Sequence, residues 1–145
     1  MKIAIGNDHV AVEMKNEIKA HLEERGIEVI NFGTDTPDSV HYPTYGHLVG
    51  KAVASGEADL GIVCCGTGIG IGMAAGKVPG IRCALPANEF MAQMAKEHNN
   101  ANVLAFGART MTPLMANRLV DAWLDAEHLG GRHAERVAMI EDLSK

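Results

Sequence analysis

Short apolar segments alternate with longer amphipathic segments along the whole chain, and this alternation constrains the fold more than any single motif. The short segments are apolar throughout rather than at every second residue, which is typical of parallel strands covered on both faces. We therefore expect a three-layer α/β/α fold with a five-stranded parallel sheet, built as one domain over residues 1–145. The expected strands are 3–5, 27–30, 60–64, 81–85 and 103–106.

The longer segments have helical periodicity, and several carry start signals. Pro43 and Pro113 suit the first turn of a helix, and Asn88 suits an N-cap. A glycine-rich loop at 66–72 leads into a further helix, whereas the Gly, Pro, Asp and Thr residues of 31–39 predict a loop. The other expected helices are 12–24, 43–54, 88–97, 113–126 and 132–143.

A doubly wound sheet binds ligands beyond the carboxyl ends of its strands, where the strand order reverses. In the commonest five-stranded order, this point lies between the first and third strands. The two loops there would be 6–9 and 65–70, which are also the loops richest in reactive side chains. Topology and composition therefore predict one functional site, formed by these two loops.

Alternating glycines follow the third expected strand, at Gly66, Gly68, Gly70 and Gly72. Glycines allow successive backbone N–H groups to turn toward one point, and the start of the next helix adds a partial positive charge. This arrangement suits an oxyanion or a phosphate. The loop lacks the Gly-Lys-Ser/Thr of a Walker motif and does not match a dinucleotide-binding fingerprint. A tight strand–helix turn without any ligand also explains the glycines and remains the alternative.

Cys65 stands at the end of that strand, directly before the glycine loop. A thiol has an unperturbed pKa near ~8.5, which falls near helix N-termini, so it can act as a base or as a nucleophile. Side chains alternate across a strand, so Cys64 and Cys65 should point to opposite faces. We expect Cys65 to face the crevice, and Cys64 and Cys83 to be inert residues of the core.

Asp8 and His9 end the first strand. A carboxylate beside an imidazole can handle hydroxyl protons or contact a phosphate. Asp8 would equally be explained as the cap of the helix that follows.

His98 and Asn99 lie between the fourth helix and the fifth strand, which places them at the amino end of their own sheet. This is the wrong end for the crevice, so a functional role would have to be in a neighbouring subunit. The alternative is an ordinary helix C-terminal motif, in which His and Asn are common.

The candidate phosphate ligands are three arginines, since a guanidinium fork matches phosphate oxygens. Arg132 and Arg136 are four residues apart and share one helix face, and Arg109 follows the fifth strand. A solvated helix face that also carries Glu135 explains the pair of arginines equally well.

A formal net charge of -5 argues against a general nucleic-acid binder, and no apolar run approaches the ~18 residues of a membrane helix. The three cysteines, two of them adjacent, argue against a disulfide framework and favour a reducing, cytoplasmic location. The remaining histidines have no partner at metal-site spacing, so no metal is expected.

Taken in order, these motifs resemble the ribose-5-phosphate isomerase type B and galactose-6-phosphate isomerase family from Lys2 to about Ile140. Several separate motifs in one order are more specific than any one of them. The matching stretches are Gly6–His9, Asp59–Ile71, Lys77–Arg82, Glu97–Val103 and Gly130–His133.

The resemblance implies a cofactor-free homodimer, or a tetramer, of Rossmann-like subunits that share their sites. It implies that Cys65 moves a proton between C1 and C2 of a sugar phosphate through a cis-enediol, with ribose 5-phosphate and ribulose 5-phosphate as the expected pair. Asp8 would contact the reacting hydroxyls, and His98 would open the furanose ring. Thr67, near the enediolate oxygen, would be a further catalytic residue. The implied binding residues are Gly66, Gly68, Ile69 and Gly70 for the enediolate, Asn99 and Tyr42 for the sugar, and His9, Arg109, Arg132 and Arg136 for the phosphate.

The chain also departs from the family pattern. Gly72 and Gly76 stand where Ser and Asn are frequent, which we expect to open the pocket or remove sugar contacts. The segment 41–46 is similar to the galactose-6-phosphate branch, whereas His98 and Asn99 are similar to the ribose branch. A 6-phosphohexose, such as galactose or allose 6-phosphate, is therefore an alternative substrate. The competing functions are a non-catalytic phosphosugar-binding module and a thiol enzyme that uses Cys65 as a covalent nucleophile.

Overall fold

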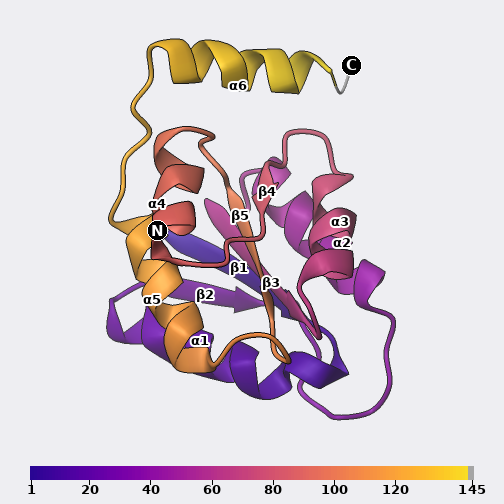
Figure 1. Ribbon diagram of the computed structural model, residues 1–145. Coiled ribbons are helices and arrows are strands. Elements are labelled where there is room, and N and C mark those ends of the chain that lie inside the picture. Colours follow the sequence, from indigo (N-terminus) through magenta and orange to yellow (C-terminus); the bar gives the residue numbers. More distant parts are fainter. Residues whose placement is uncertain (144–145) are drawn as a thin grey trace.

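A parallel sheet forms the centre of the molecule and carries helices on both faces (Figure 1). The computed structural model describes residues 1–143. The strands are β1 (Lys2–Asn7), β2 (Glu28–Asn31), β3 (Leu60–Cys65), β4 (Cys83–Ala84) and β5 (Val103–Gly107). The helices are the short 3-10 helix η1 (His9–Ala11), α1 (Val12–Glu24), α2 (Tyr42–Ala54), α3 (Ile69–Gly76), α4 (Glu89–Glu97), α5 (Pro113–Leu124) and α6 (Arg132–Asp142). The expected three-layer fold with five parallel strands is therefore confirmed.

The strand order is β2-β1-β3-β5-β4, so β1 and β3 are neighbours as expected. The other edge departs from the commonest order, because β5 lies inside the sheet and β4 at its edge. All five residues of β5 are buried, whereas the residues of β4 are half-buried. The longer, fully apolar strand thus takes the inner position.

The edge strand β4 is also shorter than the expected 81–85. The N–H of Ile81 donates to the carbonyl of Val78 at 3.1 Å, and the N–H of Arg82 donates to Oδ1 of Asn102 at 2.8 Å. These two N–H groups are satisfied outside the strand ladder, so regular pairing begins only at Cys83.

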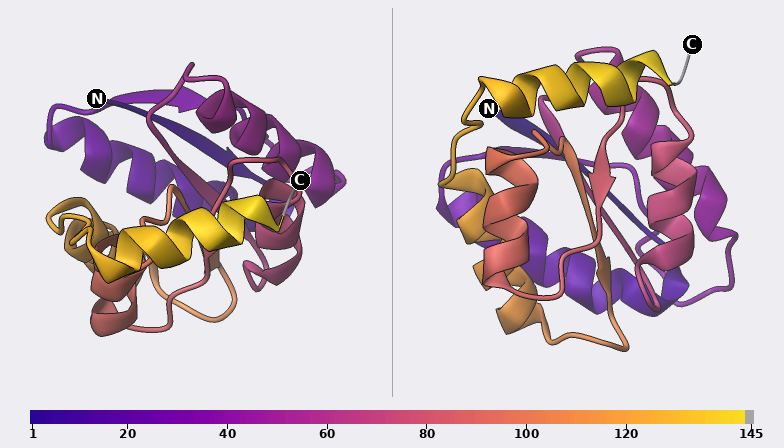
Figure 2. Two further views of the ribbon diagram at one scale, coloured as in Figure 1. Left: turned by 90° about the horizontal axis from the view of Figure 1, so that it is seen from above. Right: turned by 45° about the horizontal axis from the view of Figure 1, so that its top comes forward.

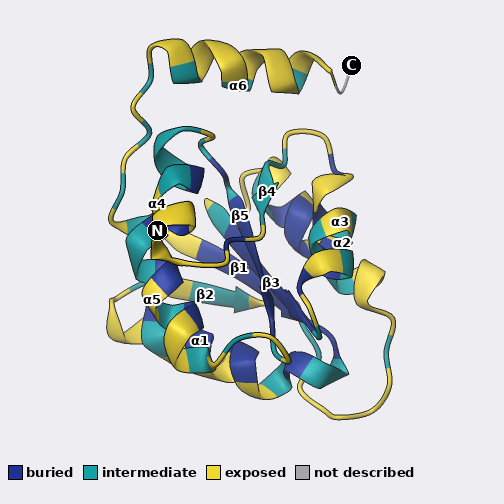
Figure 3. Ribbon diagram, viewed as in Figure 1, coloured by how far each residue is buried: buried dark blue, intermediate teal, exposed yellow. Residues whose placement is uncertain are grey.

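The strands of the sheet are buried at its centre (Figure 3), and one hydrophobic core lies on each face. The adjacent cysteines of β3 belong to different cores. Cys64 packs in the core beneath α1, α4 and α5, whereas Cys65 packs in the core beneath α2 and α3. The expected opposite orientation of the two thiols is confirmed.

Helix α6 lies across one end of the molecule, and none of its residues is buried (Figure 2). It is held to the rest of the chain by a few contacts. Arg82 pairs with Glu141 at 2.6 Å, and the rings of His98 and His133 stack with centroids 4.1 Å apart. None of the helices within residues 1–143 is long and apolar enough to cross a membrane.

Helices α2 and α3 approach each other closely through glycines. A Cβ added at Gly46 would lie 2.6 Å from the carbonyl oxygen of Ile71, and one added at Gly50 would lie 3.0 Å from that of Ala75. Because α3 begins directly after the glycine loop, this packing sets the position of the loop.

We predict that Gly46→Ala lowers the free energy of unfolding by about 1–3 kcal/mol, because the new methyl group forces α2 and α3 apart. Gly76→Ala is the matched control: its Cβ would meet only Cys83, at 4.0 Å, and alanine favours the helix by up to about 1 kcal/mol. Urea unfolding of both variants measures the difference. Equal effects of the two substitutions would contradict the packing argument.

Candidate functional site

Neighbouring strands bring two reactive loops together. Asn7, the last residue of β1, is paired with Cys64 in β3, and the N–H of Asp8 donates to the carbonyl of Cys64 at 3.2 Å. Asp8 and Cys65 therefore leave the same edge of the sheet side by side. The expectation that 6–9 and 65–70 form one site is supported by this geometry.

A cavity of about 470 Å³ opens between these loops. It brings together side chains from η1, α2, the glycine loop, α3 and the segment after β5. Its walls are Asp8, Val10, Tyr42, Cys65, Gly66, Thr67, Ile69, Gly70, Met73 and Arg109.

The Cys65 side chain lies at this cavity and accepts a hydrogen bond from the backbone. The N–H of Gly68 donates to Sγ at 3.2 Å, and the residue is 5% exposed. Gly68 adopts a φ of +80°, and a Cβ there would lie 2.8 Å from the backbone of Phe106. Glycine is therefore required at this position for the amide to reach the sulfur.

The two other thiols are in less reactive surroundings. Burial raises the pKa of Cys64, which is fully enclosed, and also raises the pKa of Cys83 to about 12. A raised pKa means less thiolate at neutral pH, so both thiols are poor bases and poor nucleophiles.

The glycine loop is held in shape from both sides. Thr67 Oγ1 accepts a hydrogen bond from the N–H of Ile69 at 3.2 Å. A Cβ at Gly70 would lie 2.5 Å from the Tyr42 ring, so the absence of a side chain lets that ring pack against the loop. On the other side, the N–H of Arg109 donates to the carbonyl of Gly66 at 2.9 Å.

Asp8 combines both functions considered for it. Its Oδ1 accepts a hydrogen bond from the N–H of Val10 at 3.0 Å and so caps η1, while the side chain also lines the cavity.

His9 is half-buried and follows Asp8, and its Nδ1 accepts a hydrogen bond from the N–H of Val40 at 3.2 Å. The imidazole thus ties η1 to the loop before α2.

Four of the expected site residues lie elsewhere in the chain. His98 and Asn99 follow α4, and Arg132 and Arg136 are exposed on α6, at the end of the molecule that carries the His98–His133 stack. Within one chain they form a second cluster, separate from the Cys65 cavity. This agrees with the expectation that His98 and Asn99 lie at the amino end of the sheet.

A second hollow of about 590 Å³ runs along α3 from Gly68 to Asn99. Gly72 and Gly76 line this groove and not the Cys65 cavity. The missing side chains therefore leave space in this groove, where a Cβ at Gly72 would lie 3.5 Å from Sγ of Cys83 and one at Gly76 would lie 4.0 Å from its Cβ.

Val10 and Met73 are two further walls of the cavity, which the sequence motifs did not indicate. Met73 is four residues after Ile69, so helical periodicity could have placed both on one face of α3. In the part of the chain that the structure describes, no three His, Cys, Asp or Glu side chains group together as metal ligands would.

Fold and site together define a doubly wound α/β protein with a thiol at its crevice and a glycine loop in place of a nucleotide motif. Comparison with known proteins is more specific. The model of the ribose/galactose isomerase family matches residues 3–140. Ribose-5-phosphate isomerase B of Escherichia coli is 50% identical over 139 residues, which cover 96% of this chain and 93% of that protein.

Two further relatives show the breadth of the similarity. The structure of ribose-5-phosphate isomerase B of Clostridium thermocellum superposes with a TM-score of 0.97 at 54% identity, covering 99% of this chain and 97% of that one. The galactose-6-phosphate isomerase subunit LacB of Clostridium acetobutylicum is 43% identical over 128 residues, covering 88% of this chain and 74% of that protein. The chain belongs to the ribose/galactose isomerase family and is an aldose–ketose isomerase.

We predict that an alkylating agent such as iodoacetamide modifies Cys65 of the native protein at pH 8, whereas Cys64 and Cys83 react only after unfolding. With a pKa of about 12, Cys83 is thiolate in only about one molecule in ten thousand at this pH. Peptide mass spectrometry over time measures the order of modification. Native labelling of Cys64 before Cys65 would contradict the structure of the site.

Proposed function

We propose that Cys65 is the base that interconverts ribose 5-phosphate and ribulose 5-phosphate through a cis-enediol. The observation that carries this proposal is the Cys65 sulfur at the cavity, 3.2 Å from the amide of Gly68 and on the same edge of the sheet as Asp8. An amide N–H aimed at sulfur stabilises a thiolate, which is the form that can accept a proton.

The reaction on the open-chain sugar balances without an external redox partner. The thiolate of Cys65 removes the proton from C2 of the aldose, the C–H electron pair forms a double bond between C1 and C2, and the C1 carbonyl becomes an enediolate oxygen. Asp8 carries the proton between the two oxygens. The Cys65 thiol then returns its proton to C1, which gives the ketose.

The enediolate charge has to be stabilised for the carbon acid to react at a useful rate. The donors we assign to this charge are the N–H groups of the loop Gly66–Gly70 other than those of Gly68 and Ile69, which donate to Cys65 and Thr67, together with the start of α3. A single fixed donor of this kind is worth about 2.7–4 kcal/mol in comparable sites. Arg109, whose side chain lies over Gly66, is the ligand we assign to the phosphate within the same chain.

We propose that the active enzyme is a homodimer in which a second chain completes each cavity. Two features support this. Helix α6 has no buried residue although Met139 and Ile140 are large and apolar, and the groove along α3 is lined mostly by apolar side chains. The partner's His98 and Asn99 would then open and bind the sugar, while the partner's Arg132 and Arg136 would contact the phosphate.

The second candidate substrate is a 6-phosphohexose. It is favoured by the similarity to the galactose-6-phosphate isomerase subunit and by an open cavity of about 470 Å³ beside Cys65.

We place the enzyme in the cytoplasm, since all three of its thiols are free and a reducing compartment keeps them so.

Replacement of Cys65, the proposed base, should affect catalysis but not substrate binding. We predict that Cys65→Ala lowers kcat by about 10²–10⁴-fold, the range typical of a lost general base, while ribulose 5-phosphate still binds. Cys64→Ala is the matched control, because its side chain lies on the opposite face of β3, and it should retain kcat within about threefold at some cost in stability. Isomerase assays and calorimetric titration measure the two quantities. Full turnover by Cys65→Ala would end the proposal.

The shared site is tested by complementation. Cys65→Ala and His98→Ala chains are each expected to be impaired, but a co-expressed mixture should regain up to about a quarter of wild-type activity, since mixed dimers contain one intact site. A mixture of Cys65→Ala and Arg109→Ala chains is the control. Arg109 and Cys65 belong to the same cavity of the same chain, so no intact site can form and no activity should return. Recovery in both mixtures, or in neither, would contradict shared sites.

A further inference from the structure

The only fully buried charged side chain among residues 1–143 is that of Lys15 on α1, with no exposed surface. Its place on the helix is unusual, since it lies on the apolar face between Ala11 and Ile18, both of which are buried. Burial of an ammonium group costs several kcal/mol unless partners compensate for the lost water. Packing of the hydrophobic core alone therefore does not explain a lysine at this position.

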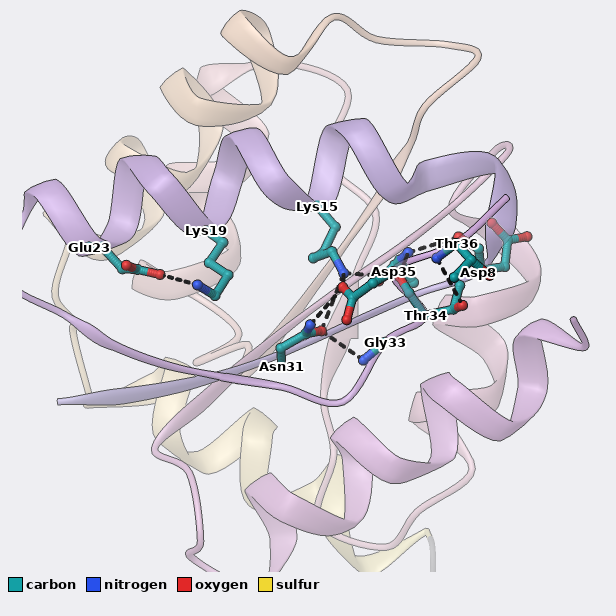
Figure 4. Close-up of polar contacts among 10 residues, drawn as sticks. Asp8, Lys15, Lys19, Glu23, Asn31, Gly33, Thr34, Asp35 and Thr36 are labelled. Carbon is teal, nitrogen blue, oxygen red and sulfur yellow. Dashed lines mark hydrogen bonds and ion pairs between the residues drawn. The ribbon is translucent and has the colours of Figure 1, made fainter. Parts of the chain in front are cut away.

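The partners of Lys15 lie at the end of β2 and in the segment that follows it (Figure 4). Its Nζ donates to the carbonyl of Thr34 at 3.0 Å, to Oδ1 of Asp35 at 2.5 Å and to Oδ1 of Asn31 at 3.4 Å. The hydrogen bond from Lys15 lowers the pKa of Asp35, so this carboxylate is charged at neutral pH. Lys15 therefore fastens the segment 31–35 against α1.

The same network reaches the cavity through Asn7. Its Nδ2 donates to the carbonyl of Thr34 at 3.0 Å, the oxygen that Lys15 also contacts, and to the carbonyl of Asp8 at 2.8 Å. The Asn7 side chain packs directly against Gly33, where an added Cβ would lie 1.8 Å from Oδ1 of Asn7. The Thr34 carbonyl, which accepts from both Lys15 and Asn7, thus links the buried ammonium through the Asn7 side chain to the backbone of Asp8.

We propose that Lys15 is a positioning residue for the isomerase reaction: by holding Thr34, it sets Asn7 and thereby the orientation of Asp8 at the cavity. It does not itself contact the substrate. This inference rests on the proposed role of Asp8 at the reacting hydroxyls. A loss of the network would let residues 31–35 move away from β1 and would leave Asp8 held by the contacts of its own turn and by the hydrogen bond from its N–H to the carbonyl of Cys64.

Lys15→Met keeps the length of the side chain and removes its charge, and Lys19→Met is the matched control on the same helix. Lys19 pairs with Glu23 at the surface, one turn further along α1 (Figure 4). We expect Lys15→Met to lower kcat about tenfold with folding intact, and Lys19→Met to change kcat less than about twofold. A lowered Tm with unchanged kcat would show that Lys15 serves stability alone and would overturn the proposal.

A double-mutant cycle with Asp8 distinguishes positioning from general damage. In an Asp8→Ala background, Lys15→Met should cost less than about twofold in kcat, because the group that it orients is gone. Equal losses in both backgrounds would overturn the inference. The Asp8→Ala single variant reports separately on the proposed function, since that proposal fails if Asp8→Ala retains wild-type kcat.

Asp35→Asn covers the case in which Lys15→Met does not fold. The Asp35 side chain is 67% exposed, so its replacement leaves the core intact while it removes the ion pair with Lys15. We expect a loss in kcat of about threefold that also disappears in the Asp8→Ala background. No loss, or a loss of the same size in both backgrounds, would contradict the network.

Discussion

The hydrogen bond from the Gly68 amide to the Cys65 sulfur is the contact on which the rest of the site depends. It requires a left-handed backbone at residue 68, and it requires the glycine loop to turn directly from β3 into α3. The close glycine contacts between α2 and α3 hold that turn in place. The pairing of β1 with β3 then brings Asp8 to the same point. A local backbone geometry and a packing constraint between two helices thus together place one thiol at the cavity.

Much of this arrangement could be predicted from the sequence, because it depends on short-range patterns. The alternation of apolar segments predicted the layers, and the predicted bounds 12–24 of α1 are confirmed. The alternation of side chains along a strand predicted that Cys64 and Cys65 lie on opposite faces of the sheet. The order of β4 and β5 could not be predicted, since it depends on long-range competition between strands for the inner position. Lys15 was also missed. Its position on the apolar stripe of α1 was a visible signal, but its partners in 31–35 are set by tertiary structure.

The site residues fall into two groups at opposite ends of one chain. Asp8, Tyr42, Cys65 and Arg109 surround the cavity, whereas His98 lies beside α6 at the other end. In the proposed mechanism the two groups have different tasks, proton transfer at carbon and opening of the sugar ring. The proposed homodimer would bring the two groups together, because the exposed apolar side chains of α6 and the groove along α3 offer surfaces for a second chain.

The central claim is that a proton, and not a hydride, moves between neighbouring carbons by way of the Cys65 thiol. Isomerisation in deuterated water, followed by NMR of the product, tests it most directly. A proton shuttle places solvent deuterium on the carbon that receives the proton, because a thiol exchanges its hydrogen with water while the enediolate is held. A product that keeps its original hydrogen completely, through many turnovers, would contradict a proton shuttle and indicate direct hydride transfer.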